Sequence, residues 1–424
     1  MITSFILFSI LLFTGLPIYV NLGLCSFLYM FMEGFNPIAV LQRITMTANS
    51  FTLLAAPFFI LMGNIMNNSG VTTRMFNFAN ALVGHFIGGL GHANVLASLM
   101  FAGGSGTAVA DAGGLGNIEI KAMRENGYDV DFACAVSASS SILSPITPPS
   151  LPMVILAVTV EASIGRLFLG GIIPGLLVTA SLMIMVFIYA RKRNYPRGPK
   201  PTIKTLWVSF KDAFWALLAP LILFSGILSG VFTPTEAAVV AAFYSLILGL
   251  FIYKEFTLKS IPKVIMATCE TTGVVLALVM TANVFGYILS VSQVPQSMTA
   301  LLLSLSDNKI ILLMIINVFL LIVGMFMEAL ALILILSPIL VSVMINAGLN
   351  ETHACMIIVL NLMIGVITPP VGVVLYVISN VAKISFERVT KATAPFLIPL
   401  LFVLILVTYV PGFTTFLPNL VFGK

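Results

Sequence analysis

The chain has 424 residues, of which 59% are hydrophobic and 8% are charged, and its formal net charge is +5. A soluble domain carries roughly 25% charged residues, so this composition excludes a soluble protein and indicates one embedded in a lipid bilayer. The excess of Lys and Arg is typical of the cytoplasmic side of membrane proteins and does not indicate a nucleic-acid partner. At about 20 apolar residues per spanning helix, roughly a dozen segments are candidates.

The N-terminal region, residues 2–32, is apolar and long enough for two helices with a corner at Gly15-Leu16-Pro17. It has no basic stretch at its start, so it is predicted to be membrane-embedded mature chain and not a cleaved signal. A more polar connection is predicted over residues 33–49.

Residues 93–120 are rich in small residues, apolar on average, and carry an acid, Asp111, within the glycine-rich part. A flexible soluble linker would be polar, and this stretch is not. We predict a re-entrant helical hairpin here, with its tip inside the membrane. Residues 121–131 are charged and are expected to leave the membrane.

A helix break is predicted within residues 132–158 by the sequence Ile146-Thr147-Pro148-Pro149. Two successive prolines remove two backbone N–H donors, and their rings clash with the preceding turn, so a helix cannot continue through them. In a bilayer, a broken helix must be buried in protein or line a wet cavity.

Residues 191–212 form the clearest boundary in the chain. The segment combines three prolines with seven basic residues: Arg191, Lys192, Arg193, Arg197, Lys200, Lys204 and Lys211. Because short loops rich in Lys and Arg stay in the cytoplasm, this linker is predicted to be cytoplasmic. It divides the chain into a first repeat, residues 1–190, and a second repeat, residues 213–424.

The two halves repeat each other in sequence. The second copy of the break begins at Ile367, and 367 − 146 = 221 residues separate it from Ile146. Other pairs match at the same offset: Gly103 with Gly324, Met123 with Met344, Gly127 with Gly348, and Cys134 with Cys355. The repeat predicts a second hairpin over residues 310–346 and a second broken helix over residues 354–380. Broken helices at corresponding places in two halves are typical of a transporter's binding site.

The repeats are predicted to be inverted with respect to the membrane. An odd number of spans before the linker gives that arrangement, and it places the N-terminus on the periplasmic side. Inverted repeats suit a transporter because one architecture then supplies two exchangeable conformations. The expected fold is an all-α polytopic membrane protein in which each repeat carries a re-entrant hairpin and a broken helix.

The breaks have the chemistry of a Na⁺ site. An unwound helix frees backbone carbonyls, and threonine adds hydroxyl oxygens, which together are the hard ligands that such a cation prefers. The predicted Na⁺ ligands are Ser105, Thr107, Ser144, Thr147 and Pro149 in the first repeat and Gly324, Gly365, Thr368 and Val371 in the second. One Thr-Pro-Pro break alone is best interpreted as a packed kink, but two copies, each paired with a glycine-containing segment, favour the ion site.

Two acids, Asp111 and Glu328, lie deep in apolar sequence. An ionisable group there is costly and is by default a candidate for function, in coupling to Na⁺ or H⁺ or in contacting the substrate, while a structural role at the hairpin tip stays open. The predicted substrate-binding residues are Ser105, Gly106, Thr107, Asp111 and Glu328. No Lys or Arg lies in the glycine-rich or Thr-Pro-Pro segments, so helix N-termini, hydroxyls and co-bound cations must neutralise an anionic substrate.

These segments resemble the signature motifs of one known family, the large membrane subunit of tripartite ATP-independent periplasmic (TRAP) transporters. The likeness runs end to end and rests on Gly104-Ser105-Gly106-Thr107-Ala108-Val109-Ala110-Asp111, Pro145-Ile146-Thr147-Pro148-Pro149-Ser150, Phe232-Thr233-Pro234-Thr235-Glu236-Ala237, Gly324-Met325-Phe326-Met327-Glu328 and Ile367-Thr368-Pro369-Pro370-Val371-Gly372. Two positions depart from the family's usual pattern: Thr107 replaces a serine and Glu328 an aspartate. Both replacements keep an oxygen but alter its geometry.

The resemblance implies a secondary transporter of the bacterial inner membrane, with the fold of the ion-transporter superfamily and an elevator motion. It implies import of an organic acid by Na⁺ symport, with Na⁺ at the positions given above. It also implies two protein partners, a small four-helix membrane subunit and a periplasmic substrate-binding protein, in addition to membrane lipid.

Three other functions fit parts of the sequence. A stand-alone Na⁺-carboxylate symporter would need neither protein partner. An intramembrane enzyme would use Asp111 and Glu328 as a carboxylate pair, but such pairs need both acids near one substrate bond, and nothing in the sequence brings them together. A passive channel is disfavoured because paired broken helices suit alternating access.

Overall fold

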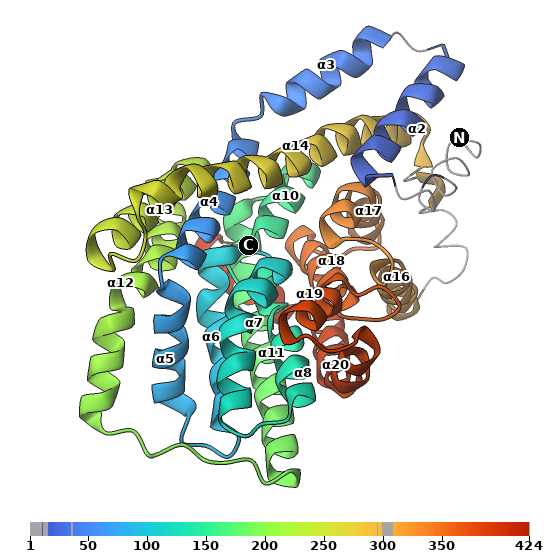
Figure 1. Cartoon of the computed structure of the whole chain (residues 1–424). Helices are drawn as coiled ribbons and strands as arrows, with labels where there is room; N and C mark the ends of the chain where they lie inside the picture. Colours follow the sequence, from blue (N-terminus) through green and yellow to red (C-terminus); the bar gives the residue numbers. More distant parts are fainter. Residues whose placement is uncertain (1–10, 12–15, 35–36, 295, 299–307, 424) are drawn as a thin grey trace.

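The computed structural model describes residue 11 and residues 16–34, 37–294, 296–298 and 308–423. Within these residues the chain is helical apart from short connections, and its β-structure is a single isolated bridge between Ile87 and Arg197. Figure 1 shows α5 and α6 running side by side, with the long helix α14 crossing above them.

The described helices of the first half are α2 (Ile18–Met32), α3 (Pro37–Ala48), α4 (Ala55–Asn68), α5 (Val71–Val83), α6 (Gly89–Ser105), α7 (Ala108–Glu125), α8 (Val130–Ser140), α9 (Leu143–Ile146), α10 (Leu151–Val160) and α11 (Ile164–Lys192). Local signals set several of their ends. Gly70, with φ 69°, precedes α5, and Gly88, with φ 73°, precedes α6. Glycine adopts such a positive φ without the strain that a side chain would bring.

The described helices of the second half are α12 (Ile203–Leu228), α13 (Pro234–Ile247), α14 (Ile261–Val291), α16 (Lys309–Gly324), α17 (Ala329–Asn346), α18 (Glu351–Gly365), α19 (Val373–Ala382), α20 (Phe386–Tyr409) and α21 (Gly412–Phe422). A capping box starts α13: the Thr233 hydroxyl accepts a hydrogen bond from the Glu236 N–H, and the Glu236 carboxylate accepts one from the Thr233 N–H at 2.8 Å. Pro234 takes the first helical position, where its missing N–H has no cost.

Six segments of the described chain are long and apolar enough to cross a membrane: Ile164–Lys192, Ile203–Leu228, Pro234–Ile252, Leu258–Val291, Ala329–Asn346 and Phe386–Tyr409. Two bent pairs also pass together, residues 40–48 with 52–68 at 56° and residues 130–146 with 151–160 at 42°. The number of spans expected from the sequence is higher because it includes short apolar helices such as α16 and α18, which have 16 and 15 residues.

The predicted polar connection over residues 33–49 is wrong, because most of it is the helix α3. Val40 is buried, and Arg43 lies over the ring of Tyr287 on α14, so the polar residues of this segment belong to a helix and do not interrupt one. Of the two helices predicted in residues 2–32, the second is α2, and the first falls outside the described residues.

Within the predicted linker, α11 continues to Lys192 and α12 begins at Ile203, so the non-helical connection is residues 193–202. Tyr195 and Arg193 both donate hydrogen bonds to the Asp129 carboxylate, at 2.7 and 2.8 Å. The hydrogen bond from Tyr195, together with the Arg193 charge, lowers the pKa of Asp129 from its usual value. These contacts fasten the connection to the loop between α7 and α8.

Equivalent helices of the two halves exchange partners. α17 begins 329 − 108 = 221 residues after α7, and α19 begins 373 − 151 = 222 residues after α10. α10 packs against α17, and its counterpart α19 packs against α7. In the same way, α2 packs against α14, and α13 packs against α4. Each hairpin therefore packs against the broken helix of the other half as well as that of its own half, because α7 also packs against α8 and α17 against α18.

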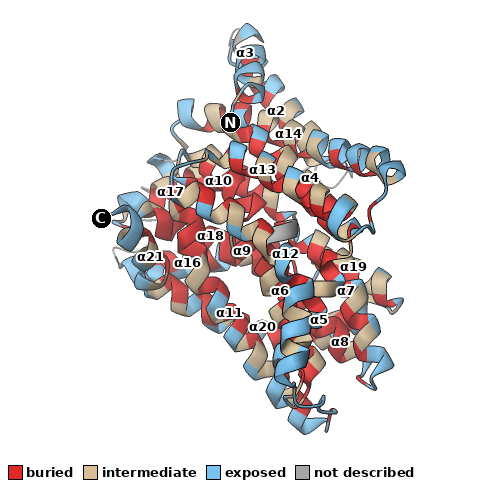
Figure 2. Cartoon of the chain, turned by 90° about the vertical axis from the view of Figure 1, so that its left-hand side faces the viewer, coloured by how far each residue is buried: buried red, intermediate tan, exposed pale blue. Residues whose placement is uncertain are grey.

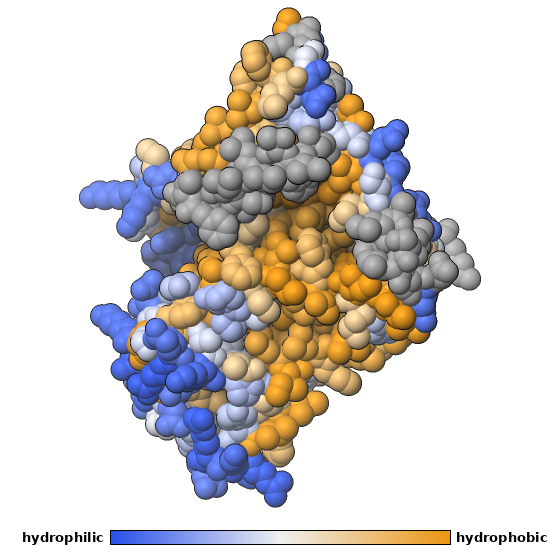
Figure 3. All heavy atoms as spheres, turned by 90° about the vertical axis from the view of Figure 1, so that its right-hand side faces the viewer, coloured by the Kyte–Doolittle hydropathy of each residue, from blue (hydrophilic) through white to orange (hydrophobic). Residues whose placement is uncertain are grey.

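The core runs through the broken helices. In α18 every residue after Glu351 is buried, and in α8 every residue from Phe132 to Ser140 is buried. Figure 2 shows buried residues gathered in the middle of the molecule around α9, α17 and α18, with exposed residues toward the outside. Figure 3 shows an apolar surface across the middle of another face, with hydrophilic residues near its edges. An apolar band of this kind suits contact with lipid.

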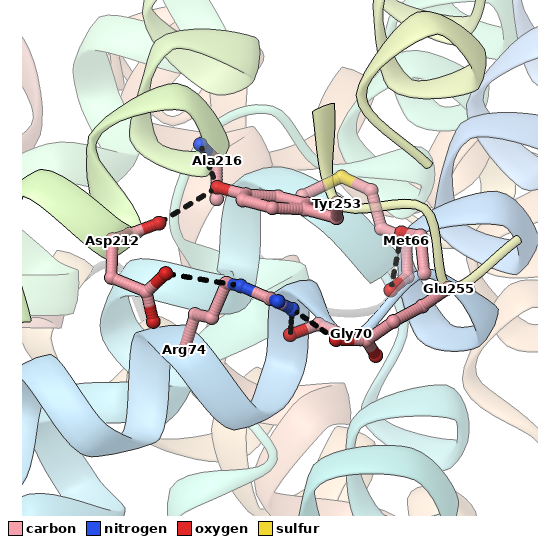
Figure 4. Close-up of polar contacts among 8 residues, drawn as sticks. Met66, Gly70, Arg74, Asp212, Ala216, Tyr253 and Glu255 are labelled. Atoms are coloured by element: carbon pink, nitrogen blue, oxygen red, sulfur yellow. Dashed lines mark hydrogen bonds and ion pairs between the residues drawn. The ribbon is translucent and has the colours of Figure 1, made fainter. Parts of the chain in front are cut away.

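Arg74 joins the two halves at the N-terminal end of α5 (Figure 4). Its guanidinium pairs with Asp212 of α12 at 3.4 Å and with Glu255, between α13 and α14, at 2.7 Å. The guanidinium carbon also lies 4.1 Å from the centre of the Tyr253 ring. We call these four residues the Arg74 clamp. It fixes α5, which precedes the first hairpin, against the second half.

Candidate functional site

The first hairpin turns at Gly106 and Thr107. Gly106 adopts φ 61°, a conformation that favours glycine, directly after the end of α6. Thr107 is extended, and its hydroxyl accepts a hydrogen bond from the Ala110 N–H at 3.3 Å, which caps α7. Such a cap stabilises a helix by about 1 kcal/mol. The chain thus reverses within two residues, and the start of α7 lies at the hairpin tip.

The first helix break packs directly on this turn. α9 ends at Ile146, and α10 begins at Leu151 after a short extended stretch. A Cβ at Gly106 would lie 3.1 Å from the Leu151 nitrogen and 3.7 Å from the Pro149 carbonyl oxygen. The absence of a side chain at Gly106 therefore lets the hairpin tip approach the broken helix closely.

The second hairpin and the second break also meet backbone to backbone. α16 ends at Gly324 and α18 at Gly365, and a Cβ at Gly365 would lie 2.8 Å from the Gly324 Cα. The Val371 N–H, within the break, donates a hydrogen bond to the Met325 carbonyl at 3.2 Å. Glu328 is extended and precedes α17 as its N-cap residue.

A cavity of about 580 Å³ lies between the two hairpin tips and the two breaks. We call it the central cavity. Its lining includes Thr107–Ala110 and Glu328–Leu330 from the tips, Pro145, Leu151, Pro152, Val366 and Val373 from the broken helices, and Asn64, Asn67, Glu270 and Thr271 from α4 and α14. The repeat therefore places corresponding parts of both halves around one space.

Four described helices start at the central cavity, and residues of their first turns line it: Ala108 of α7, Leu151 of α10, Ala329 of α17 and Val373 of α19. A helix N-terminus carries roughly half a positive charge and free N–H groups that favour an anion. The described lining has two carboxylates, Glu270 and Glu328, and neither Lys nor Arg. The cavity thus offers helix N-termini to an anion, and its two carboxylates carry negative charge that a cation must offset.

The residues predicted to bind substrate fall into separate places. Thr107 and Glu328 line the central cavity, and Gly106 forms the turn beside the first break. Asp111 is not among the lining residues: it is 1% exposed, and its Oδ2 accepts a hydrogen bond from the Ser144 hydroxyl at 3.0 Å. The structure therefore gives Asp111 and Glu328 no common surface on which to act as a carboxylate pair.

Contacts between each hairpin and its break bring together some of the residues predicted to bind Na⁺. In the second repeat, Gly324 meets Gly365, and Val371 bonds to Met325. In the first repeat, the turn at Gly106 approaches Pro149, whereas Ser144 bonds to the buried Asp111 and the Thr147 hydroxyl faces Gly175 of α11. Thr107 caps α7 at the hairpin tip. Of these, Thr107 also lines the cavity. The side chain of Ser105 lies outside the described part of the structure.

The hydroxyls of the two break threonines differ in their partners. The Thr147 hydroxyl is buried without a hydrogen-bond partner among the described residues, and it faces Gly175 of α11, where a Cβ would lie 2.5 Å from its oxygen. The Thr368 hydroxyl donates to the Ile364 carbonyl at 2.7 Å. An unpaired buried hydroxyl costs about 1–3 kcal/mol, so Thr147 gains the more from a bound cation or water.

A second buried acid, Glu119, is not among the predicted site residues. It lies on α7 two turns after Asp111, so both acids face the same side of the helix. The Ser137 hydroxyl donates to Glu119 at 3.2 Å, and the Asn94 amide donates to that hydroxyl at 2.6 Å. The spacing of eight residues along one helix is the signal that pairs these acids.

The sequence prediction also misses the contribution of α4 and α14 to the cavity. Asn64 and Asn67 come from α4, and Glu270 and Thr271 come from α14. Asn64 further donates a hydrogen bond to the Thr268 hydroxyl of α14 at 3.0 Å. Polar residues within otherwise apolar α4 are the available signal. Their meeting with α14 depends on packing between the halves, which no local pattern reveals.

Comparison with known proteins identifies the family. The family model described as "Tripartite ATP-independent periplasmic transporter, DctM component" matches residues 5–413. The chain belongs to this family. It is 46% identical to the sialic acid TRAP transporter large permease protein SiaM of Vibrio cholerae, over 97% of each chain. It is 44% identical to the sialic acid TRAP transporter permease protein SiaT of Haemophilus influenzae, over 98% of this chain and 68% of that protein.

Other TRAP permeases and solved structures extend the comparison. The C4-dicarboxylate TRAP transporter large permease protein DctM of Rhodobacter capsulatus is 36% identical over 97% of each chain. The solved structure of the Alcanivorax borkumensis YdaH transporter matches with a TM-score of 0.61 at 15% identity, covering 88% of this chain and 87% of that chain. This TRAP permease is therefore an all-α polytopic membrane protein. Family membership confirms the prediction of a transport protein and not an enzyme.

Proposed function

We propose that this TRAP permease takes up an organic acid together with Na⁺ through the central cavity. The observation that carries the proposal is the charge of that cavity, where four helix N-termini face a lining with Glu270 and Glu328 and, among the described residues, no Lys or Arg. The N-termini attract a carboxylate, and the two acids repel it. Bound Na⁺ offsets the repulsion, so the acid and Na⁺ bind together.

The proposed Na⁺ sites are the two contacts between a hairpin and a break. Each offers backbone carbonyls and hydroxyls, the oxygen ligands that hard cations prefer. The first uses Ser105, Thr107, Ser144, Thr147 and Pro149, and the second uses Gly324, Gly365, Thr368 and Val371. In the first break, the buried Thr147 hydroxyl lies beside Gly175 of α11 without a hydrogen-bond partner among the described residues, so its oxygen is available to a cation. A cation there lies beside the helix ends that meet the substrate.

The packing supports two inverted repeats, residues 1–190 and 213–424, joined by the linker of residues 191–212. α10 on α17 and α19 on α7 are exchanged pairs, as are α2 on α14 and α13 on α4. Such exchange is expected when a two-fold axis relates the halves. The hairpins with their broken helices then move as one body in an elevator motion, and the crossing helices α4 and α14 connect that body to the rest.

The proposed location is the bacterial inner membrane, with the linker in the cytoplasm and the N-terminus in the periplasm. Seven basic residues in the linker support the first part, since short loops rich in Lys and Arg remain cytoplasmic. Inversion of the repeats supports the second part. Substrate then enters from the end of the molecule opposite the linker.

The proposed partners are a small membrane subunit and a periplasmic binding protein. The family description names a tripartite transporter, and the Vibrio relative is named a large permease protein. Two relatives at 44% and 46% identity are named for sialic acid, and one at 36% is named for C4-dicarboxylates. Sialic acid, a carboxylic acid with many hydroxyls, is therefore the first substrate to test.

Uptake into proteoliposomes that hold this chain and its small subunit tests the proposal. Labelled sialic acid and succinate are offered with and without an inward Na⁺ gradient, and with and without the binding protein. We expect uptake only when the gradient and the binding protein are both present. Uptake that requires the Na⁺ gradient but not the binding protein would support the stand-alone symporter. Uptake that is the same with and without the Na⁺ gradient would exclude the proposed coupling.

A further inference from the structure

A second cavity adjoins the central cavity and differs from it in charge. Its volume is about 520 Å³, and it is lined by α3, α10, α14 and α17. Leu334 lines both cavities. Along α10 the lining passes from Leu151 in the central cavity to Thr159 in the second, and along α14 from Glu270 to Ser290. The two cavities thus lie end to end along the same helices.

The second cavity lies at the end of the molecule away from the linker. Glu161, which ends α10, lines it, and α11 then runs from Ile164 to Lys192 in the linker. A helix of that length extends about 43 Å, more than the thickness of the hydrocarbon core. Figure 1 likewise shows α3 at the top and the connection between α11 and α12 at the bottom. With the linker in the cytoplasm, the second cavity faces the periplasmic side.

This second cavity supplies the positive side chain that the central cavity lacks. The guanidinium carbon of Arg43 on α3 lies 4.1 Å from the centre of the Tyr287 ring on α14, and both residues line the cavity. Stacking on the ring orients the planar guanidinium and leaves its N–H edge available to a carboxylate. Within the part of the chain that the structure describes, Arg43 has no ion pair.

The rest of the lining carries polar side chains and one carboxylate. Asn283 of α14 offers an amide to a ligand. The hydroxyls of Ser290 on α14 and Thr159 on α10 donate to carbonyls of their own helices and can still accept a hydrogen bond from a ligand. Glu161 lies in the same lining and repels a second carboxylate. One cation and one anion in a polar space suit a monocarboxylate with several hydroxyls better than a dicarboxylate.

We propose that the Arg43 cavity is an outer binding site that receives a polyhydroxylated monocarboxylate before it reaches the central cavity. That the acid binds first at Arg43 and then in the central cavity rests on the proposed function. Binding of the carboxylate at Arg43 is independent of the proposed function, because it requires neither Na⁺ nor movement of the hairpins. The carboxylate pairs with Arg43 at the outer site and exchanges that partner for helix N-termini and Na⁺ further in.

Chemical modification of Arg43 tests binding without transport. Phenylglyoxal, which reacts with guanidinium groups, is applied in Na⁺-free buffer to this chain and its small subunit in lipid nanodiscs, and modified peptides are quantified by mass spectrometry. At about ten times its Kd, sialic acid is expected to slow modification of Arg43 roughly tenfold. Arg191, exposed at the linker end of α11, serves as the internal control and keeps its rate. The methyl ester of sialic acid lacks the charge and is expected not to protect Arg43.

Transport by variants gives the second measurement. Arg43→Ala is expected to raise the KM of sialic acid uptake roughly tenfold. The loss of one hydrogen bond to a charged group weakens the affinity for the carboxylate by about that factor. Arg43→Lys keeps the charge and recovers part of the loss. Glu161→Gln is expected to lower the KM for succinate, and Arg191→Ala, the matched control, leaves both KM values unchanged.

The outcomes separate this inference from the proposed function. Protection of Arg43 by the acid with no Na⁺-driven uptake would support the outer site and contradict the proposed function. Equal modification of Arg43 with the acid and with its methyl ester would overturn the outer site, even if uptake is driven by Na⁺. An unchanged KM in Arg43→Ala would overturn it as well.

Discussion

Thr147 and Thr368 show how one residue type, at equivalent places in two repeats, acquires different partners. Within the described part of the chain, the buried Thr147 hydroxyl is unpaired, whereas the Thr368 hydroxyl donates to the Ile364 carbonyl. A hydroxyl that donates a hydrogen bond keeps oxygen lone pairs for a cation, so both threonines remain suitable ligands. They differ in what the protein loses when no ion is bound, because only Thr147 then leaves a buried polar group unsatisfied.

Replacing each threonine by valine tests both ion sites. Thr147→Val and Thr368→Val remove the hydroxyl and keep the shape of the side chain. Because each variant loses one oxygen ligand, each is expected to raise the Na⁺ concentration for half-maximal uptake roughly tenfold. Without Na⁺, Thr147→Val is expected to keep or slightly raise the thermal unfolding midpoint, whereas Thr368→Val loses about 1 kcal/mol of stability with its hydrogen bond. Uptake at varied Na⁺ and thermal unfolding measure both effects. Wild-type Na⁺ dependence in both variants would remove these residues from the ion sites.

The two conspicuous acids show what single residues in a sequence do not reveal. Asp111 and Glu328 both lie near a hairpin tip, and the sequence ranks them alike. At the repeat offset, 328 − 221 = 107, so Glu328 corresponds to Thr107 at the tip and lines the cavity as that residue does. Asp111 corresponds to Leu332, which is also buried. The difference of four residues decides which acid reaches the cavity, and it becomes visible only once the repeat is placed in space.

At the scale of elements, local signals locate the site and long-range packing completes it. The Pro-Pro sequences and the glycines predict the breaks and turns, because each acts on the backbone within a few residues. The residues of α4 and α14 that line the cavity are not predicted, since they meet only when the halves pack together. The hydrogen bond from Asn64 to Thr268 joins residues 204 positions apart, a distance that no sequence period covers.

The Arg74 clamp is a long-range contact of this kind and can be tested as a unit. Arg74→Ala, Glu255→Ala and the double variant form a cycle in which we expect a coupling of about 1 kcal/mol, because the Arg74 side chain is largely buried and its partners are half exposed. Thermal unfolding midpoints of the purified variants give the coupling.

A matched control for this cycle is available in the exposed pair Lys121 and Glu125, whose charged atoms lie 4.0 Å apart one helical turn from each other. Its coupling is expected to be close to zero, because solvent screens exposed charges. Additive effects of Arg74→Ala and Glu255→Ala would show that the clamp does not join the two halves energetically.

At the scale of the whole molecule, charge is ordered along the route that the cavities define. Arg43 lies in the Arg43 cavity, and Glu270 and Glu328 lie in the central cavity. The basic linker lies at the end of the molecule opposite the Arg43 cavity. On the proposed route, an organic acid gives up its ion pair with Arg43 where the proposed Na⁺ sites begin. This arrangement gives a physical reason for coupling, since neither charge is stable in the central cavity without the other.

Composition and the two break motifs suffice to predict an all-α membrane transporter with two broken helices, because they depend directly on apolar content and on local backbone breaks. Two features are not predicted, because they depend on contacts between distant segments. They are the exchange of packing partners between the halves and the position of helix α3 beside the Arg43 cavity.

The most direct test is a structure of this chain and its small subunit, determined by electron cryo-microscopy with Na⁺ and the acid that the uptake panel identifies. We predict density for the acid in the central cavity, with its carboxylate at the N-terminus of α7 or α17, and density for Na⁺ at the contacts of Gly106 with Pro149 and of Gly324 with Gly365. In a matched sample with K⁺ in place of Na⁺, the acid is expected to be absent from that cavity. Equal density for the acid in K⁺, or density outside the cavity in both samples, would contradict the account.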